Sequence, residues 1–162
     1  MTMHRSATLL AALGLLLGGR AHAGLLDSPP LSIGGQPGTV VYRMGPVYYE
    51  PGHADTVVSC TNFADGPTAM VLEIFDENDV LRATANSAPV PANGSVTFAT
   101  SGHPDIDGAV IPAGMPDVEH GKARVSATTA RITCAAKTQV VGSDGNVKER
   151  PLELVKKVAL GD

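Results

Sequence analysis

The stretch ARITCAAKTQVV, residues 130–141, decides the fold class. Its small and apolar side chains alternate with polar ones, which is the two-residue period of a half-buried β-strand and not the period of a helix. The even positions are Ala130, Ile132, Cys134, Ala136, Thr138 and Val140, and the odd positions include Arg131, Thr133, Lys137 and Gln139. Cys134 therefore faces the interior of the predicted sheet.

Short β-rich stretches recur along the chain, and turn signals such as DEND (76–79), PANG (91–94) and GSDG (142–145) separate them. No helical pattern is evident before residue 150. The expected strands lie in residues 39–44, 47–50, 57–61, 68–76, 80–85, 95–100, 123–141 and 146–154, with a long loop at 101–122. Residues 123–141 form either one strand or one strand that leads into another. This spacing predicts an all-β fold, an immunoglobulin-like antiparallel β-sandwich of about seven or eight strands.

The first 23 residues have the three parts of a secretory signal peptide. Arg5 lies in a short basic start, residues 7–19 are mostly apolar, and AHA (21–23) is a small-x-small cleavage site. We expect a signal peptide over 1–23, a flexible Pro- and Gly-rich leader over 24–38, and a single β-sandwich domain over 39–162. The predicted location is the periplasm or the cell exterior.

Net charge limits the classes of partner. Cleavage would remove Arg5 and Arg20 and no acidic residue, so the formal net charge would change from −4 to −6. An acidic chain is a poor match for nucleic acid or an anionic membrane. After the signal no second long apolar run occurs, so we expect no membrane insertion.

The two cysteines of the chain, Cys60 and Cys134, are 74 positions apart. Zinc sites usually need four ligands at close spacing, and no nearby Cys or His completes such a set. Cys60 shares its parity with Val58, so both cysteines can face inward. In an exported chain this pattern predicts one inter-strand disulfide, which we expect to join strands across the two sheets.

Three histidines remain after the signal, and they give the alternative function. His53, His103 and His120 each lie in a Gly-containing stretch with an acidic neighbour. Imidazole and carboxylate suit Zn²⁺ or Cu²⁺, so converging loops could make a metal-binding periplasmic protein. No pair has the close spacing of a metal motif, so solvated loop residues are the favoured explanation of the three.

The sequence lacks the patterns of catalysis. It contains no Gly-x-Ser-x-Gly nucleophile motif and no Gly-rich phosphate loop before a helix. We therefore expect no enzyme activity and no cofactor. The favoured function is a binding or structural module that meets another exported protein through a sheet edge. The candidate edges are TVVYRM (39–44) and NVKERPLEL (146–154), and the oligomeric state stays open.

Three stretches together resemble small exported bacterial β-sandwich proteins. They are VVSCTNF (57–63), SVTFATSG (95–102) and GKARVSATTARITCAAKTQV (121–140). The resemblance covers residues 56–141 and implies an exported, disulfide-linked β-sandwich. It implies no activity, ligand or catalytic residue.

Overall fold

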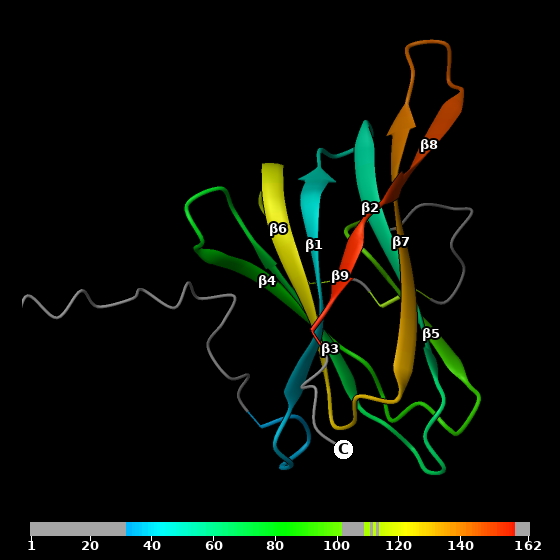
Figure 1. Ribbon diagram of the computed structural model, residues 1–162. Helices are drawn as coiled ribbons and strands as arrows, with labels where there is room; N and C mark the ends of the chain where they lie inside the picture. Colours follow the sequence, from blue (N-terminus) through cyan, green and yellow to red (C-terminus); the bar gives the residue numbers. More distant parts are fainter. Residues whose placement is uncertain (1–31, 102–108, 111, 113, 158–162) are drawn as a thin grey trace, which may run out of the picture.

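The computed structural model describes residues 32–101, 109–110, 112 and 114–157 (Figure 1). Within these residues the chain forms nine β-strands, and none of it forms a helix long and apolar enough to cross a membrane. The strands are β1 (Thr39–Tyr49), β2 (Ala54–Asn62), β3 (Met70–Phe75), β4 (Leu81–Asn86), β5 (Ser95–Ala99), β6 (Val118–Ala127), β7 (Ile132–Val141), β8 (Val147–Leu152) and β9 (Leu154–Lys156). The expected signal peptide, residues 1–23, lies outside the described residues.

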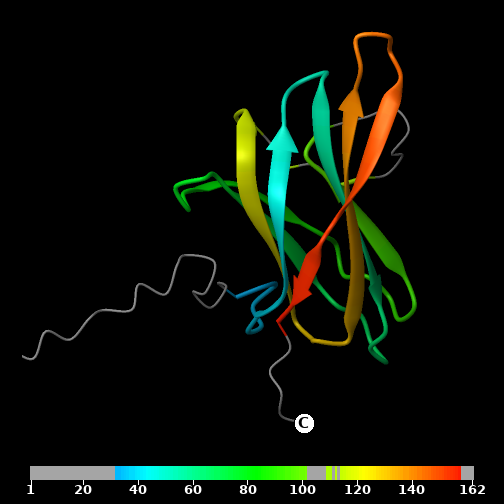
Figure 2. The same cartoon turned by 45° about the horizontal axis from the view of Figure 1, so that its top comes forward.

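The strands form two antiparallel sheets packed face to face (Figure 2). The five-stranded sheet has the order β4-β3-β6-β1-β9, and the four-stranded sheet has the order β5-β2-β7-β8. The predicted all-β antiparallel sandwich is confirmed. The immunoglobulin-like arrangement within that class stays a prediction.

The strand boundaries differ from the sequence prediction in several places. The expected break at Gly45–Pro46 is absent, because β1 runs through both residues. Of the two alternatives for residues 123–141, the structure has two strands, since the end of β6 and all of β7 lie in different sheets and residues 128–131 join them. At the C-terminus β8 continues past Glu153 into β9, and the chain crosses from one sheet to the other (Figure 2). The described strands therefore number nine.

Part of the expected loop 101–122 is strand, since β6 begins at Val118. His120 and Gly121 look like a turn signal in the sequence, but they form a bulge inside the strand. Val47 and Tyr49 of β1 are two positions apart in the sequence. Their partners in β6, Gly121 and Val118, are three positions apart. A bulge inserts one residue without ending the pairing.

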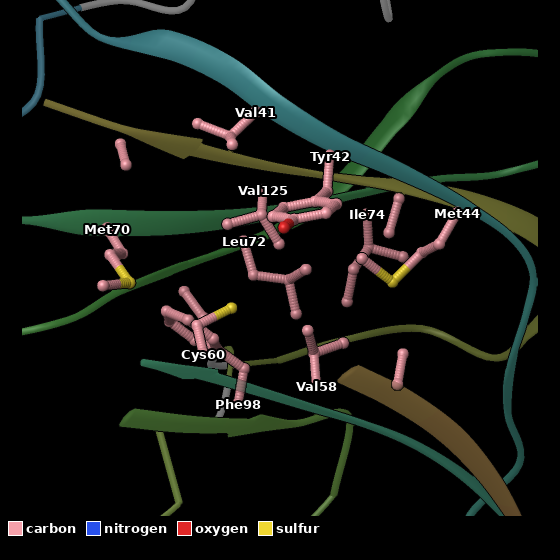
Figure 3. Close-up of a cluster of buried hydrophobic side chains, with 14 of the residues drawn as sticks. Val41, Tyr42, Met44, Val58, Cys60, Met70, Leu72, Ile74, Phe98 and Val125 are labelled. Atoms are coloured by element: carbon pink, nitrogen blue, oxygen red, sulfur yellow. The ribbon is translucent and has the colours of Figure 1, made fainter. Parts of the chain in front are cut away.

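The core lies between the two sheets and follows the predicted alternation (Figure 3). Leu72 and Ile74 of the five-stranded sheet face Val58 and Phe98 of the four-stranded sheet, and all four are at most 1% exposed. Such burial contributes about 1.5–3 kcal/mol for each large side chain. The even positions of β7 are also buried or partly buried through Thr138, as expected from ARITCAAKTQVV.

Candidate functional site

The disulfide joins Cys60 of β2 to Cys134 of β7, with an S–S distance of 2.09 Å. The two residues are direct partners in the β2–β7 register, and their Cα atoms are 4.1 Å apart. The expectation that the bond would cross between the two sheets is wrong, because β2 and β7 are neighbours in one sheet. Parity showed that both cysteines face inward, but it could not show which strands are adjacent. Neither sulfur is a free thiol.

The histidines do not form a metal site within the described part of the chain. His53 is exposed in the turn between β1 and β2, and His120 is exposed near the start of β6. Both lie at the end of the sandwich where β1 ends and β2 and β6 begin (Figure 1). His103 lies outside the described residues. Among the residues that are described, no three His, Cys, Asp or Glu side chains are grouped to hold a metal ion.

The sheet edges are the other candidate site, and one of the two expected edges is wrong. TVVYRM (39–44) belongs to β1, which lies between β6 and β9, and its residues 42–44 are internal because they pair with β9. NVKERPLEL (146–154) supplies β8 and the start of β9, which are edge strands of the two sheets. The remaining edges are β4 and β5.

Three of the four edges carry features that oppose pairing with another chain. β8 has Pro151, which cannot donate a backbone hydrogen bond, and three consecutive charged residues at 148–150. β9 has only three residues. The outer side of β5 is already occupied, since the N–H of Val110 donates to the carbonyl of Thr97 and the N–H of Ala99 donates to Val110.

β4 is the least protected edge among the described strands, and it lies at one side of the molecule (Figure 1). It contains no proline and one charged residue, Arg82. The register shifts at Arg82, whose guanidinium binds the Asp76 carboxylate. From Ala83 to Asn86 the pairing with β3 is regular. This regular stretch is long enough to align with a short extended segment.

The backbone groups on the free side of β4 follow from its pairing. The N–H of Ser87 donates to the carbonyl of Met70 at 2.9 Å, which makes these two a hydrogen-bonded pair. Hydrogen-bonded and non-hydrogen-bonded pairs alternate in an antiparallel ladder, so Ala85 also bonds β3. Thr84 and Asn86 therefore direct their N–H and C=O groups away from β3, toward the free edge.

A shallow depression of about 210 Å³ adjoins this edge on the outer face of the five-stranded sheet. Its apolar lining is Ile33, Val71 and Leu81, and Thr84 and Asn86 are among its polar residues. Leu81 is 43% exposed, and its neighbour Val80 is 47% exposed. Apolar surface therefore lies next to backbone groups of β4 that pair with no other described strand.

The charge in the depression is already neutralised. Glu73 lines it, but its carboxylate accepts two hydrogen bonds from the Arg124 guanidinium, at 2.6 and 2.9 Å. Arg124 also stacks over the Phe75 ring, 5.2 Å from its centroid. The depression therefore favours an uncharged side chain. This property was not evident in the sequence, because it depends on which strands are neighbours.

No protein-family model and no curated protein matches the chain. Among the solved structures, the crystal structure of FlgD from Xanthomonas campestris matches the chain with a TM-score of 0.30 and 18% identity. That structure concerns the hook capping that is essential for flagellar assembly. The match covers 69% of this chain and 65% of that chain. A similarity at this level carries no argument about function.

Proposed function

We propose that the protein is a non-enzymatic, exported binding module that accepts an extended segment of another exported protein at the free edge of β4. The observation that supports this proposal is the contrast between β4 and the three protected edges. The disulfide is compatible with export, since disulfides persist in oxidising compartments. The proposed location is the periplasm or the cell exterior.

The geometry of β4 defines what the added segment would contact. The backbone of the added segment would exchange hydrogen bonds with the backbone of Thr84 and Asn86. These bonds would supply affinity that does not depend on the sequence of the segment. Alternate side chains of the segment would face the outer side of the sheet, where the depression lies. Ile33, Val71 and Leu81 would favour an aliphatic side chain there. The proposed partner segment is thus extended, uncharged and aliphatic at alternate positions.

Site-specific photocrosslinking in the native cell tests the proposal. A photoreactive phenylalanine analogue replaces Thr84 on β4 or, as the control, Arg150 on β8, and both positions are exposed. We expect a covalent adduct with a different exported protein from position 84 and none from position 150. Equal adducts from both positions would contradict the proposal. An adduct only with a second copy of this chain would replace the proposed partner by a homodimer.

A charge on the edge should weaken binding of the captured partner. Asn86→Lys places an ammonium group beside the free backbone groups, and edge lysines oppose strand pairing. We expect the Kd to rise at least about tenfold, equivalent to about 1.4 kcal/mol. Ser59→Lys is the matched control, because Ser59 is exposed on the outer face of the other sheet. Binding by calorimetry should be unchanged in the control, and equal losses in both variants would reject the β4 site.

A further inference from the structure

A second cavity lies at the end of the sandwich, where β1 ends and β6 begins. Its volume is about 200 Å³, and its aliphatic lining residues are Ala54 and Val118. The polar and aromatic lining comprises Tyr48, Tyr49, Glu50, Glu119 and His120. Two of the three tyrosines of the chain are thus in one cavity with two carboxylates and an imidazole.

The bulge in β6 shapes this cavity. Two residues of the bulged stretch, Glu119 and His120, line the cavity. His120 has a φ of +54°, a conformation that is uncommon for residues other than glycine. Gly121 follows, where an added Cβ would lie 2.6 Å from the carbonyl oxygen of Phe75. Bulges commonly redirect side chains at functional sites.

Hydrogen bonds hold Tyr48 in place in the cavity lining. The Tyr48 hydroxyl is 3.0 Å from His120 Nδ1, and the two rings meet edge to face with centroids 5.2 Å apart. The Thr56 hydroxyl accepts from the Tyr48 N–H and donates to the Tyr48 carbonyl, both at 3.0 Å. The Thr56 N–H in turn donates to the Thr100 hydroxyl at 2.9 Å. Tyr48 is therefore fixed to β2 as well as to β6.

The chemistry of the lining selects the class of ligand. Glu50 and Glu119 offer negative charge, and no Lys or Arg is among the described residues that line the cavity. Tyrosine faces attract organic cations, and carboxylates form charge-assisted hydrogen bonds with ammonium or guanidinium groups. Ala54 and Val118 can contact an aliphatic stem. A metal ion is a poorer match, since the described residues contain no group of three ligating side chains.

We propose that this cavity binds an organic cation carried on an aliphatic stem, as in a Lys or Arg side chain or a free alkylamine. The site is separate from the β4 edge, and neither proposal depends on the other. Glu50 and Glu119 neutralise the cation, Tyr48 and Tyr49 contact it through their rings, and Ala54 and Val118 pack against the stem.

Titration monitored by NMR tests the site on the whole protein. The probes are Nα-acetyl-lysine methylamide, the arginine and norleucine equivalents, and butylammonium. We expect saturable shifts of Glu119 and His120 signals with the cations, with a Kd in the range of about 1 mM. Norleucine, which has the stem but no charge, should cause none. Tighter binding of the lysine derivative than of butylammonium assigns a peptide source, and equal binding assigns a free amine.

Two variants separate recognition from folding. Glu50→Gln and Glu119→Gln keep the side-chain shape, and each should raise the Kd for the lysine probe at least about tenfold. Glu77→Gln is the control, because Glu77 is exposed in the turn between β3 and β4, and it should leave the Kd unchanged. Equal shifts with the norleucine probe, no shift with any of the three cationic probes, or unchanged affinity in both cavity variants would overturn the proposal.

Discussion

Asn62 shows how one residue connects several loops of the sandwich. Its side chain is fully buried at the end of β2. Its amide nitrogen donates to the carbonyls of Gly66, Val90 and Pro91, and its amide oxygen accepts from Ala64 and Thr68. These five hydrogen bonds satisfy the group completely, as burial requires. Asn62 in the stretch VVSCTNF therefore has a structural role, which is to connect these loops.

Asn62→Ala should lower the free energy of unfolding by about 3 kcal/mol, because it leaves several buried partners without a hydrogen bond. Urea denaturation measures this loss. Asn86→Ala is the matched control, since Asn86 is exposed and should change stability by less than about 0.5 kcal/mol. Similar losses in the two variants would show that the Asn62 network does not hold the loops.

Cys134→Ala should destabilise the protein by about 2–5 kcal/mol, because the disulfide closes a long loop in the unfolded chain. The separation of 74 residues between the cysteines makes that loop long. Thermal unfolding with and without reductant provides the measurement. The melting temperature of the wild type should fall in reductant and that of the variant should not. Equal wild-type values under both conditions would contradict a structural role.

At the level of elements, the β3–β4 turn is organised by one carboxylate. The Asp76 carboxylate accepts the N–H groups of Val80 and Asn78, each at 2.9 Å, and it binds Arg82. The hydrogen bond from the Val80 N–H is the largest effect on the pKa of Asp76, and it holds this pKa below its ordinary value. The Arg82 side chain lowers the pKa further, while burial opposes both effects. This turn fixes the start of β4 and therefore the beginning of its free edge.

The lowered pKa of Asp76 predicts how stability depends on pH. As the pH falls, the unfolded state binds a proton at Asp76 before the folded state does. The contribution of the Asp76 carboxylate to folding stability is therefore complete above the unfolded pKa of about 3.9, and it is lost as the pH falls through the folded pKa. Asp76→Asn should thus be less stable than wild type at neutral pH, and the difference should shrink in acid. Urea denaturation of both proteins between neutral pH and acid tests this prediction. A stability difference that grew in acid would contradict the lowered pKa of Asp76.

The sequence predicted the types of the elements better than their limits. Alternation in ARITCAAKTQVV placed β7 and the inward face of Cys134 correctly. It failed at β6, because His120 and Gly121 resemble a turn signal, and only pairing with β1 turns them into a bulge. It also failed at Gly45–Pro46, where pairing with β6 continues on both sides of the irregularity. Long-range pairing therefore overrides local signals at these sites.

At the scale of the whole molecule, strand order was the quantity that the sequence could not supply. The alternation of inward and outward positions along each strand predicted that Cys60 and Cys134 both face the interior. It could not show that β2 and β7 are neighbours. For the same reason residues 39–44 looked like an edge, although β9 returns from the C-terminus and covers part of β1. The free edge of β4 and the cavity beside β6 both result from this order.

Amide hydrogen exchange on the isolated complex with its captured partner tests the central proposal most directly. If the partner adds a strand to β4, exchange of the Thr84 and Asn86 amides should slow on binding, because their N–H groups face the free edge. The Ala85 amide, which already faces β3, should change less. Slower exchange confined to β8 or β5, or no change at Thr84 and Asn86, would contradict the account.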